Sequence, residues 1–182
     1  MTVTTINYIT NIVQSAYYFL NNETYVKGAN TKTLKGHFND PQLDIVLGFP
    51  PALQELSLPT IALVMQPIQP KVTMAFRDQY DMKTYTFNIY GFCGGEQSYE
   101  SNQIQRDKLA SDLTTLLEES EYMNIYSVSD SPIADDFTVK LTDCEILNVR
   151  CQNLNPTGIL VADRYRFLVS FELSYVRSLK EG

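Results

Sequence analysis

A strict two-residue alternation near the C-terminal end of the sequence constrains the fold more than any other feature. Over positions 164–175, apolar and aromatic residues alternate with polar ones, with Leu168 as the exception. Successive side chains of a β-strand point to opposite faces, so the pattern predicts one long strand with a single buried face. Strands usually have about 5–6 residues, so this one is expected to extend past its sheet and to offer backbone groups to a neighbour. The buried positions are expected to be Tyr165, Phe167, Val169, Phe171, Leu173 and Tyr175.

Several shorter segments also have strand-like patterns. An apolar run covers 61–65, and apolar residues alternate with small or polar ones in 72–76 and in 84–89. The polar stretch 78–81 between the last two predicts the turn of an antiparallel hairpin. Further strands are expected at 123–128 and, as one or two strands, within 137–141 and 144–150.

Two segments have the spacing of amphipathic helices instead. Apolar residues recur at three- and four-residue steps in 3–20 and again in 100–119, which places them on one helix face. Glu118, Glu119 and Glu121 close the second helix, where the helix dipole favours cations, so this end is expected to be exposed or to face a basic partner. Together these patterns predict an α+β fold, a mixed and largely antiparallel sheet flanked by an N-terminal and a central helix.

The segment 23–59 has neither period. It contains several Gly and Pro residues, and it is predicted to be a long loop with at most a short helical turn. Loops longer than about 12–15 residues are uncommon in compact domains and are often functional, so this loop is expected to be a contact arm. Lys35 and His37 lie in it and are candidate interaction residues.

Length and charge limit the class of protein. The 182 residues fit a single domain, and 21 acidic against 14 basic residues give a net charge of -7. Specific DNA binding requires clustered Lys and Arg, so DNA is not expected as a bound partner. Apolar runs are much shorter than the roughly 20 residues of a membrane span, and no secretory signal is recognised, so a cytoplasmically made chain with reduced cysteines is expected.

No motif predicts catalysis, a cofactor or a metal. His37 is the only histidine, and Cys93, Cys144 and Cys151 lack the close C-x₂₋₄-C spacing of structural zinc sites. The two later cysteines are expected on opposite sides of a strand unless a bulge intervenes. A small metal-dependent hydrolase using Asp130, Asp135 and Asp136, and a ligand-binding module, stay open as alternatives, and Asp→Asn variants or a thermal-shift screen would test them.

The order of elements resembles the tail-terminator and neck-connector proteins of tailed bacteriophages. The resembling stretches are Leu58, Pro59 and Thr60 leading into 61–65, then 84–90 and 106–117, and finally Asp163, Arg164 and Tyr165 leading into 167–175. The long segment 23–59 departs from the small members of that family.

The resemblance implies a structural virion protein assembled in the host cytoplasm. It implies a homohexameric ring that caps the tail tube and joins the head connector, with DNA passing through unbound. The turn residues Arg77, Asp78, Asp81 and Lys83 are expected to contact the tube or an adjacent subunit, and 23–59 the neck, sheath or neighbouring subunits. A neck, tube or baseplate role on the same particle is the alternative, and filament formation would distinguish a tube subunit.

Overall fold

Two long antiparallel strands form the centre of the fold. Strands β6 (Tyr80–Gly94) and β9 (Arg164–Ser178) pair from Tyr80↔Ser178 to Gly94↔Arg164. The predicted long C-terminal strand is therefore confirmed, and it continues to Ser178. The computed structural model describes residues 9–35, 43–48, 59–66, 71–75, 80–94, 99–129, 131–153 and 164–178.

The other strands extend the sheet on both sides of this pair. Within the described residues the sheet has seven strands in the order β3-β4-β6-β9-β8-β7, with β5 also beside β6. Strand β3 pairs parallel with β4, and the remaining ladders are antiparallel. The additional strands are β3 (Asp44–Leu47), β4 (Thr60–Met65), β5 (Lys71–Ala75), β7 (Tyr122–Tyr126) and β8 (Lys140–Asn153).

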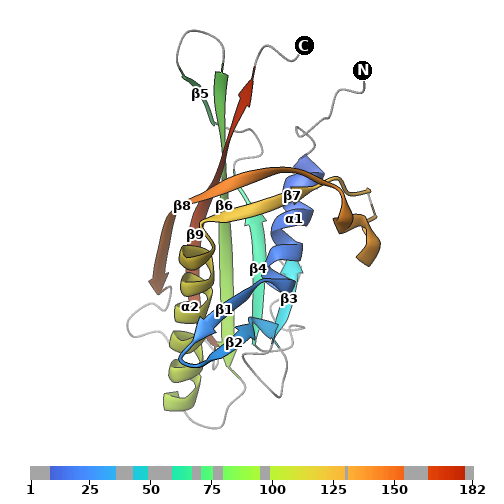
Figure 1. Cartoon of the computed structure of the whole chain (residues 1–182). Coiled ribbons are helices and arrows are strands. Elements are labelled where there is room, and N and C mark those ends of the chain that lie inside the picture. The colour runs from blue at the N-terminus through green and yellow to red at the C-terminus, as the bar shows by residue number, and fades with distance from the viewer. Residues whose placement is uncertain are drawn as a thin grey trace.

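Both helices cover one face of this curled sheet (Figure 1). Helix α2 (Tyr99–Ser120) packs on the central strands β6 and β9 and on β8. Helix α1 (Ile9–Asn22) packs on β7 and on β3, the two strands that end the sheet order. The α+β class is thus confirmed, with its mixed, largely antiparallel sheet and two flanking helices. The largest fully buried side chains include Phe87, Phe167, Phe171, Ile12, Leu20, Ile61, Leu63, Ile89, Leu109, Leu113 and Leu116.

The buried face of α1 agrees only in part with the apolar stripe expected in 3–20, which included Ile9, Ala16 and Leu20. Ile12, Ala16 and Phe19 are buried, whereas Ile9 is 38% exposed. Contact with β7 selects this face, because Asn11 and Ser15 are also buried and bind that strand. A stripe counted from apolar residues alone does not include these two polar positions.

The prediction of a long loop over 23–59 is wrong for most of its described residues. Strands β1 (Thr24–Lys27) and β2 (Asn30–Thr33) form a hairpin, and β3 lies further along. Gly28, at the hairpin turn, has φ +63, a conformation that glycine adopts without steric cost. Four-residue strands are too short to show a period, so only their pairing reveals them. Residues 36–42 and 49–58 lie outside the described part of the chain.

A second correction concerns the segment before β8. Phe137 was expected in a strand, but it belongs to the 3₁₀ helix η3 (Ala134–Thr138), and its ring stacks on Tyr18 of α1 at 4.2 Å between centroids. Strand β8 begins only at Lys140 and continues as one strand across 140–153.

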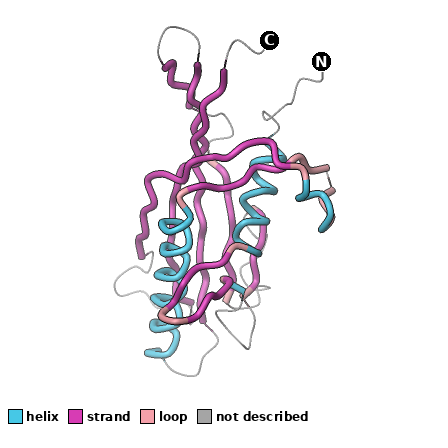
Figure 2. The backbone as a smooth tube through the Cα atoms, in the orientation of Figure 1, coloured by secondary structure: helices cyan, strands magenta, loops and turns pink. Residues whose placement is uncertain are grey.

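Three strands continue beyond the helix-covered body. We name "the arm" the ribbon formed by β5, residues 80–84 of β6 and residues 174–178 of β9, which pair in that order. Figure 2 shows the arm extending past the two helices at one end of the molecule. Strands β5 and β6 form an antiparallel hairpin, as predicted, but its register differs from the prediction. Strand β5 pairs with residues 80–84 of β6, whereas residues 87–89, expected in the hairpin, pair with β4 in the body.

Candidate interaction surfaces

The arm contains two of the residues predicted to make contacts. Asp81 and Lys83 lie in β6, where they pair with Arg177 and Tyr175 of β9. Asp81 was expected in the turn, but β6 already begins at Tyr80, so it belongs to the strand. Lys83 is half-buried. Arg77 and Asp78 lie outside the described residues.

The other two predicted residues belong to a different part of the chain. Lys35 is exposed and lies two residues after the end of β2, next to the buried Leu34. His37 lies outside the described residues. The β1–β2 hairpin lies over α2 in the body of the molecule, away from the arm (Figure 1). The structure therefore does not bring Lys35 together with Lys83.

The β1–β2 hairpin is held on α2 by one buried carboxylate. The Tyr25 hydroxyl donates to Oδ2 of Asp112 at 2.8 Å, and Nζ of Lys27 lies 2.7 Å and 2.9 Å from its two oxygens. Asp112 is only 4% exposed. Burial, together with the bond to Asp112, raises the pKa of Tyr25, so its hydroxyl stays a donor. The β1–β2 hairpin is thus packed against α2. The contact with a partner that was expected for the segment 23–59 stays a prediction.

Side chains of α1 close the β7 end of the sheet. The N–H of Tyr126 donates to Oγ of Ser15 at 2.9 Å, and the N–H of Val128 donates to Oδ1 of Asn11 at 3.1 Å. Such edge groups otherwise form a template for a further strand. Polar residues four apart on the buried face of α1 were the available sequence signal, and sequence reasoning missed them.

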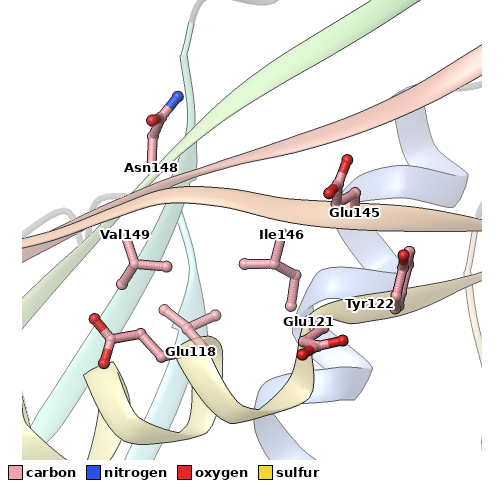
Figure 3. A pocket seen from close by; sticks show the side chains of 8 residues that line it. Glu118, Glu121, Tyr122, Glu145, Ile146, Asn148 and Val149 are labelled. Atoms are coloured by element: carbon pink, nitrogen blue, oxygen red, sulfur yellow. The ribbon is translucent and has the colours of Figure 1, made fainter.

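An acidic groove lies between β8 and the C-terminal end of α2 (Figure 3). Ile146 and Val149 point from β8 toward the helix, and Glu118 and Glu121 lie across from them. The groove encloses about 530 Å³, and Glu145 also lines it. The three carboxylates are exposed, and for Glu118 and Glu121 the sequence predicted this exposure from their place at the helix end. The groove can accept cationic groups over an apolar floor, and exposed carboxylates repel nucleic-acid phosphates.

Two residues of this groove have left-handed backbone conformations. Glu121 has φ 50 at the turn after α2, and its carbonyl accepts the N–H of Ile146 at 2.8 Å. Asn148 has φ 54 and lies where the β8–β9 register shifts, between Leu147 and Arg150. Its Nδ2 donates to Oε2 of Glu172 at 2.6 Å. Asn tolerates this conformation better than most residues, which suits it to a bulge.

The bulge at Asn148 reverses the alternation of β8. Before it Cys144 is buried, and after it Val149 packs against the core while Cys151 is exposed yet close enough to α2 to bond Thr114. The two cysteines therefore share one side of the sheet, the outcome that only a bulge permits. Burial raises the pKa of Cys144 to about 12.

The remaining candidates include a buried thiol, Cys93, and a hydrogen-bonded carboxylate, Asp136. Burial raises the pKa of Cys93 to about 12, despite the opposing influence of Arg106. Asp136 accepts from the Ser129 hydroxyl at 2.6 Å and from the Ile133 N–H at 3.1 Å, and these bonds lower its pKa. Asp130 lies outside the described residues. In the part of the chain that is described, no three His, Cys, Asp or Glu side chains are grouped to hold a metal ion.

No family model matches the sequence, and no curated protein matches it. Within the described residues, no helix is both long and apolar enough to cross a membrane.

Proposed function

We propose that this chain is a structural subunit of a bacteriophage tail that self-assembles into a ring, as a tail terminator or head-to-tail joining protein. The arm is the observation that carries the proposal. It is a three-stranded ribbon that leaves the helix-covered body and exposes strand edges beside which no other described strand lies. Strand edges are a common means of joining protein chains.

The order of elements supports the same role. The N-terminal helix, the β5–β6 hairpin, α2 and the long β9 occur in the order on which the resemblance to tail-terminator and neck-connector proteins rests. Asymmetric arms suit rings, because a ring joins one surface of each copy to a different surface of the next.

The charge of the chain supports passage of DNA without binding. The net charge is -7, and Glu118, Glu121 and Glu145 are exposed carboxylates of one groove. Binding of DNA gains free energy chiefly when cationic side chains release counterions from phosphates. A ring with an acidic inner surface therefore lets DNA slide, and a lumen lined with Lys and Arg would contradict this part of the proposal.

Light scattering on a sizing column, with negative-stain images of the same peak, tests the ring. A hexamer of the 20.7 kDa chain has a mass of about 124 kDa and shows a closed ring. Open filaments would replace the terminator with a tube subunit. A chain that stays monomeric at every concentration tested would overturn self-assembly into a ring.

Addition of purified tail tubes separates the terminator from other ring proteins. A terminator caps one end of the tube and stops its elongation, so gold-labelled protein should appear at a single end. Labelling along the tube, or no labelling, would contradict the terminator assignment and leave the neck position on the same particle.

A further inference from the structure

The direction of the main-chain groups in the arm follows from one hydrogen bond. The N–H of Gln66, just after β4, donates to the carbonyl of Thr86 in β6 at 2.7 Å. Alternate residues of a strand direct their N–H and C=O to the same side. Thr84, Met82 and Tyr80 therefore turn their backbone groups to the side of β6 where β4 lies, which in the arm is occupied by β5.

This orientation determines which β5 residues face outward. Thr84 pairs with Lys71 and Met82 with Thr73, so these two β5 residues bond to β6. Val72 and Met74 alternate with them and turn their N–H and C=O groups away from β6. Among the described residues, no strand lies on that side of β5.

The opposite edge of the arm follows from the same alternation. Thr84 turns toward β5, so its partner in β9, Ser174, turns away from β6 and toward β8, where it pairs with Glu145. That pair is the last of the β8–β9 ladder. Val176 and Ser178 point the same way but lie beyond this ladder, with no described strand beside them.

These two edges differ from the β7 end of the sheet. There, Ser15 and Asn11 of α1 already accept the edge N–H groups of residues 126 and 128. A helix that covers an edge is a common protection against unwanted pairing. Helix α1 thus covers the end of the β7 edge, whereas no strand of the described residues covers either edge of the arm.

We propose that the arm joins neighbouring copies of this chain through main-chain hydrogen bonds. The outward groups of Val72 and Met74 in one copy pair with those of Val176 and Ser178 in the next. Strands β5 and β9 both run antiparallel to β6, so they run in the same direction. Copies related by rotation about an axis along the arm keep that direction, and the junction is a parallel ladder. The proposed junction rests on the proposed ring, and it identifies the two surfaces through which the ring would close.

Proline substitution at an outward position tests the junction without breaking the hairpin. Met74→Pro removes an N–H that faces away from β6, and proline is tolerated at such edge positions. Met74→Ala is the matched control, because it changes the side chain and keeps the N–H. We expect wild type and Met74→Ala to form rings in light scattering and negative stain. Met74→Pro should remain monomeric at about tenfold higher concentration, with an unchanged circular dichroism spectrum.

Val176→Pro tests the opposite edge in the same way and should have the same effect. Rings that persist in both proline variants would overturn the edge pairing and leave the proposed ring standing. A wild-type chain that forms no ring overturns both.

Hydrogen exchange of the wild type gives a readout that does not depend on a variant folding. The amides of Val72, Met74, Val176 and Ser178 should exchange more than about tenfold more slowly in the ring than in diluted monomer. Equal exchange of these amides in ring and monomer would refute the junction.

Discussion

Substitution of Gly91 by alanine tests the packing at the centre of the sheet. Gly91 in β6 pairs with Phe167 in β9, and the Phe167 ring is fully buried. A Cβ atom at Gly91 would lie 2.0 Å from Cε1 and 2.1 Å from Cζ of that ring. Carbon atoms in contact are about 3.5–4.0 Å apart, so the ring would have to move by about 1.5 Å.

The size and the sign of the effect follow from this geometry. At an open strand position, alanine is more stable than glycine by about 0.5–1 kcal/mol, because glycine loses more backbone entropy on folding. At Gly91 the close-packed interior gives the ring no room to move, and overpacking costs about 1–3 kcal/mol. We expect Gly91→Ala to lower the free energy of unfolding by that amount.

Urea unfolding followed by far-ultraviolet circular dichroism measures this change, because the chain has no Trp. Protein concentration is held constant, since assembly would make stability depend on it. Phe167→Leu removes part of the ring, so adding Gly91→Ala to it should cost less than in wild type by about 0.5–3 kcal/mol. Gly91→Ala that is as stable as wild type, or additive effects in the double variant, would refute the reasoning.

Three further predictions concern the cysteine thiols and the contact of the β1–β2 hairpin with Asp112. In the native protein one thiol per chain, Cys151, should react with Ellman's reagent at pH 8, because Cys93 and Cys144 are buried; three reactive thiols would contradict the packing. In reducing buffer, the stability contributed by the buried thiols is fully present below pH 9 and is lost as pH rises toward 12. An unfolded thiol ionises near pH 9.0, whereas the folded pKa of both thiols is about 12. The free energy of unfolding should therefore fall by about 0.7 kcal/mol per pH unit for each thiol at pH 9, and by about 1.4 kcal/mol per pH unit between pH 10 and 11. A flat profile between pH 10 and 11, or a slope in Cys144→Ala as steep as in wild type, would count against it. Asp112→Ala should destabilise the protein by about 1.5–3 kcal/mol in urea unfolding, because it removes the charged acceptor of the buried Tyr25 hydroxyl. Tyr25→Phe should cost less, since Asp112 keeps its ion pair with Lys27. A larger loss in Tyr25→Phe than in Asp112→Ala would contradict the role given to Asp112.

Local pattern was sufficient for the elements that are long enough to show a period. Strand β9 alternates over many residues, and α2 repeats its apolar positions over several turns, so each was predictable from its own residues. The α+β class followed because such amphipathic elements can bury their apolar sides only against one another. The exposure of Glu118 and Glu121 followed in the same way from their charge.

Only the tertiary structure decided the features in which distant segments meet. The four-residue strands β1, β2 and β3 exist because a partner strand or α2 lies beside them. The bulge at Asn148 sets which side of the sheet Cys151 faces, and Ser15 closes an edge that lies more than a hundred residues further along the chain. Hydrogen bonds between such segments leave no periodic trace in the sequence, because each depends on a register that the whole sheet fixes together.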